Sequence, residues 1–468
     1  MRTRFAPSPT GFMHIGGLRT ALFCYLLARK MDGTFILRIE DTDQTRFVEG
    51  ASERIYSALK DAGITYDEGP DVGGDYGPYI QSERKDIYLK YAKELIDAGK
   101  AYRCYCTKEE LEERVKSGNE FDVNPYDRKC LGAAGREGAP YVVRQLIPEG
   151  RTSYFDEVFG EISVENAEMD DQVLIKSDGM PTYNFANVID DHLMKITHIM
   201  RGNEFLSTTP KHKMLYEAFG WDVPTYVHLP LILSPDGGKL SKRKGDAFFE
   251  DFVEKGYLPQ ALVNFIALLG FAPPDNREIF TLDELVEVFG IEGISKSPST
   301  FDTAKLKWMN GEYLKAMDAA EFAPLAVPYI TKGVQRTDVN VDAIAAMVKD
   351  RIGLLDEIPA MLDFIDDLPE YDIELFNNKK NTVETAKDML TKLLPEIEGY
   401  GSEWTTAALS DFIGTFAENN GVKKPMVLWP VRCALSGKEA SPGAVELLGV
   451  FSKAECVSRI KKALGKLE

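Results

Sequence analysis

The sequence predicts an α/β protein: a parallel-sheet domain that is split by an inserted domain and followed by a mostly α-helical C-terminal region. Three observations lead to this fold class. A helical pattern near the N-terminus runs directly into a short β-rich segment, which is the order of a parallel α/β unit. Between residues 101 and 178, cysteine, glycine and proline separate short β-like runs. Beyond about residue 245, apolar residues recur at helical spacing.

Composition bounds the class of protein. A chain of 468 residues is long enough for about three domains. Its hydrophobic fraction of 44% is ordinary, and no window has the apolar length of a membrane span or a signal peptide, so we expect a cytoplasmic protein with no membrane partner. The formal net charge of −19 argues against general nucleic-acid binding, although "GKLSKRKGD" is a local basic segment. Six cysteines are too few for a disulfide scaffold.

The first half of the sheet domain is expected in residues 1–83. Residues 18–30, "LRTALFCYLLARK", have apolar positions at helical spacing and two basic residues at the end, and Gly33 follows, which predicts a helix with a defined stop. The next run, "TFILRIED", reads as a strand, and residues 49–61 and 83–98 read as further amphipathic helices.

The other domains follow in chain order. An inserted domain is expected over 84–178, with strands such as "PYVVRQL" and "DQVLIKS", and the second half of the sheet over 179–238. In that half, "MPTYNFANVIDDHLMKITHIMRGNEF" predicts alternating apolar strands and then a helix from about Ser207. Residues 239–318 begin with the basic segment, and 319–468 read as helical because "NTVETAKDMLTKLLPEI" has a helical apolar stripe. Split α/β domains bind ligands at the carboxyl ends of their strands.

A lone histidine precedes two glycines at the start of the first helix, in "SPTGFMHIGGLRT". Gly16 and Gly17 remove side chains there, so that a phosphorylated ligand can approach the backbone and the positive end of the helix dipole. From two residues earlier, His14 can donate to a phosphate oxygen. An ordinary turn would also account for this tripeptide taken alone.

The basic segment downstream is a second candidate for phosphate binding. "KLSKRK" at 239–244 follows the flexible "SPDGG". This suits a mobile clamp on a triphosphate, in which Lys242 neutralises the leaving pyrophosphate. A solvated basic loop is the alternative explanation of such a run.

Taken together and in this order, the two segments resemble the signatures of the class I aminoacyl-tRNA synthetases, conventionally written HIGH and KMSKS. They stand here as "HIGG" and "KLSKR", with Gly17 at the position of the second histidine and with Leu240 and Arg243 in place of methionine and serine. Five flanking segments are similar to the glutamyl-tRNA synthetase family, in the same order and over nearly the whole chain: "RFAPSPTG", "RIEDTD", "YDEGPDVGG", "SDGMPTYNFANVIDDHLM" and "FDTAKLKWMNGEYL".

The resemblance implies a two-step reaction. Glutamate attacks the α-phosphate of ATP to give glutamyl-adenylate and pyrophosphate, and the 3′ end of tRNA-Glu then takes the glutamyl group while AMP leaves. Mg²⁺ is expected on the phosphates, and tRNA is expected to be needed before the adenylate forms efficiently. The implied domains are a Rossmann-type catalytic domain in two halves, an inserted acceptor-end-binding domain, a stem-contact domain over 239–318 and an anticodon-binding region over 319–468. We expect a monomer.

The resemblance also assigns residues to the substrates. Glutamate needs a cation for its side-chain carboxylate and an anion for its ammonium, for which Arg4 and Arg201 are the candidate guanidiniums and Glu40 the carboxylate. A forked arginine rejects glutamine because the neutral amide leaves its charge uncompensated. The glutamate set is Arg4, Ala6, Ser8, Glu40, Tyr183, Asn187 and Arg201. The ATP set is His14, Gly16, Gly17, Lys239, Ser241, Lys242 and Arg243, with His14 and Lys242 as catalytic residues.

Three cysteines lie close together in the inserted domain. Cys104, Cys106 and Cys130 offer three thiolates where structural zinc takes four ligands. By resemblance to a variant site of this family and of its shorter glutamyl-queuosine relatives, Tyr126 is the fourth ligand of a structural Zn²⁺. Three reduced thiols in a domain without metal are the alternative. Structural roles are expected for the remaining cysteines and for two histidines, namely Cys24, Cys433, Cys456, His192 and His198.

Reading of the anticodon is expected in the helical region, where single-stranded bases call for arginine and aromatic partners. Arg351 aligns with a position at which the family can carry an arginine that rejects the glutamine anticodon. This predicts an enzyme that charges only tRNA-Glu, and an ordinary helix-surface arginine is an almost equal alternative.

Four other functions share parts of this pattern. A glutamyl-queuosine tRNA-Asp synthetase has the catalytic half but lacks the roughly 150-residue helical extension. A glutaminyl enzyme carries a β-barrel anticodon module, whereas this terminus reads helical. A small-metabolite adenylyltransferase would share His14 and the lysine loop but would be indifferent to tRNA. A non-enzymatic tRNA-binding paralogue would have a broken glutamate pocket.

Overall fold

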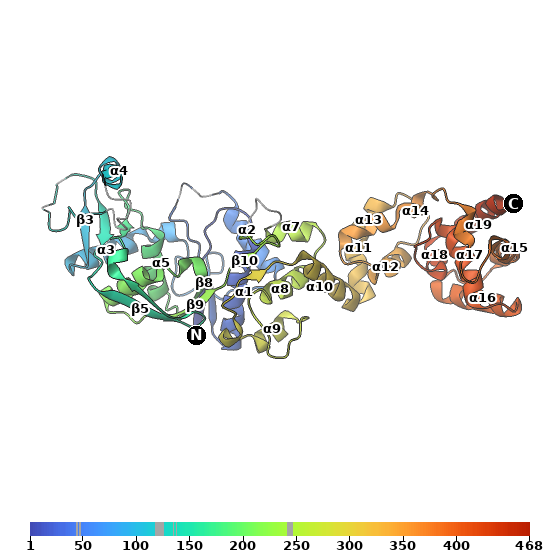
Figure 1. The fold of residues 1–468 in the computed structure, drawn as a ribbon, viewed down its shortest axis with the longest axis horizontal. Coiled ribbons are helices and arrows are strands. Elements are labelled where there is room, and N and C mark those ends of the chain that lie inside the picture. The colour runs from blue at the N-terminus through green and yellow to red at the C-terminus, as the bar shows by residue number, and fades with distance from the viewer. Residues whose placement is uncertain (44, 46–47, 118–125, 134, 137, 241–246) are drawn as a thin grey trace. The chain divides into compact units, whose positions relative to one another are not determined.

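The computed structural model describes residues 1–468 except 44, 46–47, 118–125, 134, 137 and 241–246, and only the backbone of 114–117. The chain divides into two compact units, coloured blue to yellow and yellow to red in Figure 1. Unit 1 is Met1–Glu254 with Pro259–Thr303, and unit 2 is Lys255–Leu258 with Ala304–Glu468. Unit 1 is α/β and unit 2 is helical, so the predicted fold class is confirmed. Among the described helices, none is long and apolar enough to cross a membrane.

Unit 1 begins with a parallel β–α–β unit. β1 (Arg2–Phe5) and β2 (Thr34–Leu37) pair in parallel, and α1 (Ile15–Lys30) connects them. The apolar side chains of α1 are buried almost all round, because the helix contacts both strands and also α8 (Pro259–Ala267) and α9 (Leu282–Val288). The helix begins three residues before the predicted residue 18, because its N-cap is His14.

A four-stranded sheet joins two stretches of the chain that the sequence assigns to different domains. β8 (His198–Gly202) and β9 (Thr225–Leu229) pair in parallel. The hairpin of β5 (Arg151–Asp156) and β6 (Gly160–Glu165) extends this sheet in the order β6-β5-β9-β8. β5 joins β9 through Asp156. The inserted segment therefore reaches the sheet that carries one wall of the site.

The rest of the inserted segment forms its own small sheet. β3 (Ala101–Cys104), β4 (Val142–Gln145) and β7 (Val173–Ile175) are antiparallel, in that order. β4 and β7 lie in the two runs that the sequence predicts as strands. The helices of this segment are α3 (Lys85–Asp97) and α4 (Lys108–Ser117), and α2 (Ala51–Asp61) precedes it in the chain.

One stretch predicted as strand is a helix. Residues Tyr183–Leu193 form α5, where the sequence suggested alternating strands. Its Phe185 and Ile189 pack into the core, but Asn187 and Asp191 are equally buried because they meet polar partners. Buried polar residues obscure the apolar period on which the prediction depended. The helix predicted near Ser207 is α6 (Thr209–Phe219).

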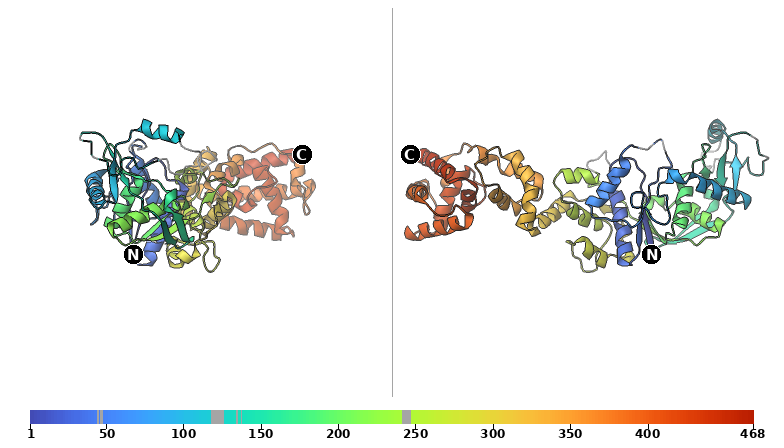
Figure 2. Two further views of the ribbon diagram at one scale, coloured as in Figure 1. Left: turned by 60° about the vertical axis from the view of Figure 1, so that its left-hand side comes forward. Right: turned by 180° about the vertical axis from the view of Figure 1, so that it is seen from behind.

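Unit 1 ends with short elements, and unit 2 is a set of packed helices. The remaining elements of unit 1 are β10 (Ile232–Leu233), α7 (Phe249–Glu254) and β11 (Ser299–Thr300). In both views of Figure 2 the last helices, drawn orange to red, pack against one another. The helices from the start of unit 2 are α10 (Thr303–Ala316), α11 (Ala319–Gly333), α12 (Val341–Lys349), α13 (Ile358–Met361), α14 (Asp363–Asp366), α15 (Val383–Gly399), α16 (Thr406–Asn419), α17 (Lys424–Ser436), α18 (Ala444–Val450) and α19 (Lys453–Leu467).

The helical stripe predicted in unit 2 is the buried face of α15. Ala386, Met389, Leu390 and Leu393 are all buried. The helix starts where Thr382 accepts a hydrogen bond from the backbone amide of Thr385, as expected of a threonine N-cap.

Candidate active site and metal centre

Unit 1 contains a cavity of about 420 Å³ where β1 and β8 end and α1 begins. This is the carboxyl end of the parallel strands, the place at which α/β domains bind ligands. The cavity brings together most of the residues that the sequence singled out for glutamate and ATP. Those in its wall are Arg4, Ala6, Ser8, His14, Gly16, Gly17, Glu40, Tyr183, Arg201 and Lys239.

His14 explains why a histidine precedes two glycines. Its Nδ1 accepts a hydrogen bond of 3.0 Å from the backbone N–H of Gly16, so the imidazole is the N-cap of α1. An accepting Nδ1 places the ring proton on Nε2 in the neutral form. Burial, and then the charge of Lys239, lower the pKa of His14 below its ordinary value, against the raising effect of the Leu240 backbone. The neutral ring therefore caps the helix and keeps one donor.

The two glycines leave the first turn of α1 bare. A Cβ atom on Gly17 would meet only Met13 and Phe5, at ordinary distances of 3.6 and 3.8 Å, so the protein's own packing does not require glycine there. Both glycines line the cavity. The open backbone at the positive end of the helix is therefore presented to whatever the cavity holds.

Only part of the basic segment can be placed. Lys239 and Leu240 line the cavity beside His14. Ser241, Lys242 and Arg243 lie outside the described residues.

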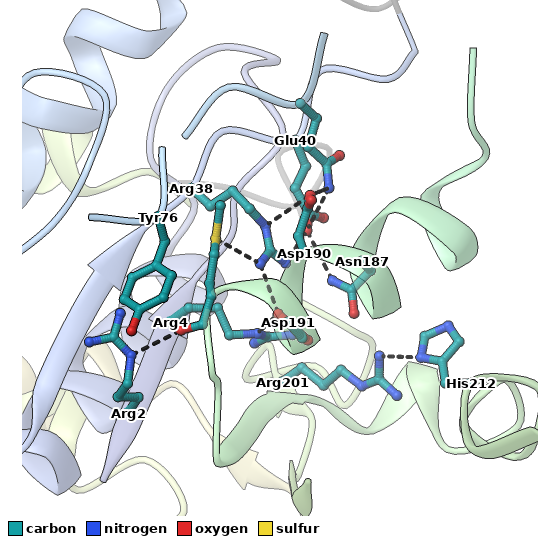
Figure 3. A network of polar contacts seen from close by, with 12 residues as sticks. Arg2, Arg4, Arg38, Glu40, Tyr76, Asn187, Asp190, Asp191, Arg201 and His212 are labelled. Carbon is teal, nitrogen blue, oxygen red and sulfur yellow. Dashed lines mark hydrogen bonds and ion pairs between the residues drawn. The ribbon is translucent and has the colours of Figure 1, made fainter. Parts of the chain in front are cut away.

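A cluster of buried charges, most of which Figure 3 shows, includes Arg4 and Glu40 of the cavity wall. It pairs three guanidiniums with three carboxylates: Arg4 with Asp191, Arg38 with Glu40, Asp190 and Asp191, and Arg84 with Asp190. Burial alone would lower the pKa of each guanidinium and raise that of each carboxyl. The attraction and hydrogen bond of Asp191 together outweigh burial at Arg4, and Asp191, Glu40 and Asp190 together outweigh it at Arg38, so both pKa values lie above the ordinary value. The two arginines in turn hold the pKa of Asp191 below its ordinary value.

Glu40 is held by one oxygen. Its Oε1 accepts from Arg38 Nη2 and from Asn187 Nδ2, both at 2.9 Å, and from Gln81 at 3.5 Å. Oε2 accepts no hydrogen bond from the described residues, and Glu40 lines the cavity. Asn187, which the sequence placed in the glutamate set, lies behind Glu40 and not in the cavity wall.

Arg201 differs from the arginines of the cluster. It is 4% exposed, lies in β8 and lines the cavity. Its guanidinium donates to His228, His212 and Thr209, and Figure 3 shows the contact with His212. Within the described part of the chain, no carboxylate forms an ion pair with it. Among the described residues this buried positive charge therefore has no ion-pair partner, and the Glu204 carboxylate in the same wall forms none with it.

A second cavity of about 520 Å³ adjoins the first. The two share Ser8, Glu40, Tyr183 and Phe205. Further wall is contributed by the residues that follow Glu40, Asp41 to Asp43, and by Lys176, whose ammonium donates to the Thr42 carbonyl at 3.0 Å. The space available to ligands thus continues past Glu40.

Several residues of the site were not found from the sequence. Arg38 could have been noticed, because a charged residue inside the apolar run "TFILRIED" calls for a buried partner. His212 and His228 carry no such signal, because each lies among ordinary helix or strand residues and its role depends on where β8 brings Arg201. The same holds for Thr209 and Asp156.

The three predicted cysteines meet in the inserted segment. The sulfur atoms of Cys104, Cys106 and Cys130 lie within 4.8 Å of one another. The hydroxyl of Tyr126 donates to Cys104 Sγ at 3.0 Å, which places its oxygen at the same cluster. Three sulfurs and one oxygen around one point are a donor set that fits tetrahedral Zn²⁺.

Unit 2 contains a cavity of about 460 Å³ lined by aromatic and basic side chains. Trp429 lies in its wall, with the Arg432 guanidinium 4.2 Å from the centre of the indole ring. Lys379 and Lys380, about 50 residues earlier in the chain, also line this cavity. The predicted Arg351 forms a two-pronged ion pair with Glu446, at 3.0 and 2.9 Å. Glu446 also accepts from the backbone of Gly443, which lines the cavity.

Comparisons with known proteins agree over the whole chain. The family described as "tRNA synthetases class I (E and Q), catalytic domain" matches residues 1–308, and "Anticodon binding domain" matches 321–464. Glutamate–tRNA ligases of Clostridium kluyveri and Clostridium novyi are 52% and 51% identical, over 100% of this chain and 98% of theirs. A crystal structure of a glutamate tRNA ligase from Elizabethkingia meningosepticum, in complex with its amino acid, has a TM-score of 0.88 at 38% identity, with 100% of each chain covered.

Proposed function

Because the chain belongs to the glutamate–tRNA ligases, which are class I aminoacyl-tRNA synthetases, we propose that its N-terminal cavity holds glutamate and ATP together and forms glutamyl-adenylate for transfer to tRNA-Glu. The match to an anticodon-binding domain over 321–464 favours this function over a glutamyl-queuosine enzyme or a small-metabolite adenylyltransferase, neither of which needs such a domain. Figure 3 shows the residues on which the glutamate end of the proposal depends.

The observation that carries the proposal is the uncompensated charge of Arg201. A buried guanidinium without an ion pair in the described residues favours a ligand that brings its own carboxylate. We assign this role to the side-chain carboxylate of glutamate. Oε2 of Glu40, which accepts no hydrogen bond from the described residues, is the acceptor for the glutamate ammonium, and Asn187 acts by holding Glu40 in place.

ATP is assigned to the His14 side of the cavity. The neutral imidazole donates from Nε2 to a phosphate oxygen, and the bare first turn of α1 offers backbone N–H groups and the helix dipole to the same phosphates. Class I synthetases use Mg²⁺ with ATP, and the ion, held by the phosphates, would neutralise part of their charge. Lys242 remains the proposed partner of the leaving pyrophosphate, on sequence grounds. The α-carboxylate of glutamate is the nucleophile, so the protein needs to supply only positioning and charge.

The cysteine cluster is proposed as a structural zinc site. Cys104, Cys106 and Cys130 would act as thiolates and the Tyr126 oxygen as the fourth ligand. The ion would tie the end of β3 to the segment around residues 126–130 and so stabilise the inserted domain. That domain is proposed to meet the acceptor end of the tRNA.

The aromatic and basic cavity of unit 2 is proposed to hold an anticodon base. Trp429 offers a ring for stacking, and Arg432 and the two lysines offer positive charge for the backbone. Arg351 is connected to this cavity through Glu446 and Gly443, which supports its proposed role in rejecting the glutamine anticodon. The enzyme is proposed to act as a monomer.

The first experiment is ATP–pyrophosphate exchange with glutamate, with and without tRNA, followed by charging of purified tRNA-Glu and tRNA-Gln. Exchange that requires tRNA and charging of tRNA-Glu alone are expected. In the Arg201→Gln variant the KM for glutamate should rise about 100-fold, with the KM for ATP changed less than about threefold, because the side-chain carboxylate of glutamate loses the buried guanidinium assigned to it. An unchanged KM for glutamate would remove Arg201 from the glutamate site.

A further inference from the structure

In the described part of the chain, the hydrogen-bond partners of the Arg201 guanidinium are all neutral groups. Nε donates to His228 Nε2 at 3.2 Å, Nη1 to His212 Nδ1 at 3.1 Å, and Nη2 to Thr209 Oγ1 at 2.7 Å. Each nitrogen of the guanidinium therefore has an acceptor, and none of these acceptors carries a charge at neutral pH. All three partners are buried, with exposed fractions of 1% or less.

The other contacts of the two imidazoles fix which ring nitrogen accepts. His212 Nε2 lies 2.9 Å from the Asn184 amide oxygen, and His228 Nδ1 lies 2.6 Å from an Asp156 carboxylate oxygen. Both of these partners are oxygens, so the rings donate to them and turn unprotonated nitrogens toward Arg201. Burial, and then the positive charges of Arg201 and Arg4, hold the pKa of His212 well below its ordinary value. Burial also lowers the pKa of His228, despite the opposing hydrogen bond that the ring donates to Asp156.

The contrast with the neighbouring arginines is the second observation. Arg4 and Arg38 are held directly by the Asp191 carboxylate, at 3.0 and 2.8 Å. A carboxylate is also available to Arg201, but Asp156 reaches it only through the His228 ring. The His228 imidazole therefore connects Asp156 of β5 to Arg201 of β8. Its ring separates the Asp156 carboxylate from the Arg201 guanidinium.

We propose that Thr209, His212 and His228 are positioning residues that fix Arg201 through neutral acceptors, so that its charge stays uncompensated until a ligand carboxylate arrives and glutamine is rejected. The inference rests on the proposed binding of glutamate by Arg201 and adds the reason for its selectivity. A directly paired Arg201 would keep the same shape and hydrogen bonds, but its attraction for a carboxylate over an amide would fall, because the pair would already be neutral.

The test compares Thr209→Asp with Thr209→Asn. The two side chains have nearly the same shape, and only aspartate brings a negative charge to Nη2 of Arg201. Thr209 is the first residue of α6, and an acidic residue is favourable in the first turn of a helix, so T209D is expected to fold. The KM for glutamate in T209D should exceed that of T209N by about 30-fold or more, which corresponds to about 2 kcal/mol. The KM for ATP should differ less than about threefold between the two.

The second measurement is kcat/KM for glutamate divided by kcat/KM for glutamine. This ratio would not change if Thr209 had only a structural role. It should fall at least about tenfold in T209D relative to T209N. Equal ratios and equal KM values for glutamate in the two variants would overturn the proposal. Thr281→Asp, which places the same substitution at the N-cap of α9 in unit 1, is the matched control and should keep both values.

The outcomes separate this inference from the proposed function. If Arg201→Gln leaves the KM for glutamate unchanged, the glutamate assignment fails and takes the inference with it. If Arg201→Gln raises that KM but T209D and T209N agree, only the neutral-acceptor role fails. Should T209D not fold, the same comparison is made with His212→Asp and His212→Asn, since asparagine places an amide oxygen where Nδ1 stands, and agreement of that pair overturns the proposal in the same way.

Discussion

His14 uses its two ring nitrogens for different tasks. Nδ1 accepts from the backbone of Gly16 and starts α1, which leaves the proton of the neutral ring on Nε2. The sequence predicts an imidazole at this helix start, but it does not tell which nitrogen faces the ligand. That choice depends on the extended backbone at residue 14, with φ −67° and ψ 139°, which a motif does not specify.

The glutamate pocket shows the same limit at the level of single residues. Arg4, Glu40 and Arg201 were predicted as members, and all three line the cavity. Their partners were not predicted, because Asp191 and His228 lie far along the chain from the arginines they orient. Neutral histidines near a cation are visible only once β8 and α6 are placed side by side.

The buried histidines predict how stability depends on pH. In the unfolded chain His212 has an ordinary pKa near 6.5, whereas in the folded protein its pKa is far lower, because it is buried and faces Arg201, Arg4, His228 and Lys211. The folded state then binds fewer protons, so this stabilising contribution is complete above about pH 6.5 and is lost as the pH falls toward the depressed folded-state pKa. One such group changes the free energy of unfolding by at most about 1.4 kcal/mol per pH unit.

Urea unfolding of unit 1 at several values between pH 5.5 and 7.5 measures this effect, in a range above the titration of most carboxylates. In His212→Asn the pH dependence of the unfolding free energy should be weaker than in the parent protein by up to that amount. His192→Asn is the control: it removes a half-buried imidazole that stacks on Trp221. This substitution should weaken the pH dependence of the unfolding free energy less than His212→Asn does. A His212 variant with the same slope as the parent would show that this histidine is not held neutral.

At the scale of elements, the order of helices and strands was predictable where one face is apolar. α1, α3 and α15 lie where the sequence places them, within a few residues. α5 was missed because Asn187, Asp190 and Asp191 are as buried as its apolar residues. Its polar face is explained by the guanidiniums of Arg4 in β1 and of Arg38, which directly follows β2, and these contacts cannot be read from the sequence of the helix itself.

The cysteine cluster joins β3 to the segment around Cys130, and it predicts metal-dependent stability of the inserted domain. Purified protein that has not met a chelator should contain about one zinc per chain by elemental analysis. Cys130→Ser and Tyr126→Phe should each lose zinc to a competing chelator at least about tenfold more readily, because each removes one of four ligands. Cys433→Ser, a buried thiol of unit 2, should bind zinc like the parent. Zinc near zero in the parent protein would establish the three-thiol alternative.

On the scale of the whole molecule, two cavities in different units are proposed to serve one reaction. The first takes the small substrates and the second takes a base of the tRNA. The division of the chain into five domains that the sequence predicts stays a prediction. The contacts between residues divide the chain into two compact units, and the larger, unit 1, includes the inserted segment.

The unit 2 cavity predicts a defect that is confined to tRNA. Trp429→Ala should raise the dissociation constant for tRNA-Glu about tenfold or more, because stacking of one base on an aromatic ring contributes about 1–3 kcal/mol. Filter binding measures the affinity, and the KM values for glutamate and ATP at saturating tRNA should stay within about threefold. Trp429→Phe keeps a flat ring and should bind more tightly than Trp429→Ala. Equal affinities of the parent protein and both variants would place the base elsewhere.

The buried charge cluster also constrains how the chain is made. Arg4 donates to Asp191, 187 residues further along, and Arg38 donates to the same carboxylate 153 residues after itself. At about 5–20 residues per second, the ribosome needs roughly 10–40 seconds to supply Asp191 after Arg4. During that time Arg4 lacks the carboxylate with which it pairs, and Arg38 has Glu40 but neither Asp190 nor Asp191, so burying the two guanidiniums would be costly. We therefore expect the β1–α1–β2 unit to complete its packing only after α5 has been synthesised.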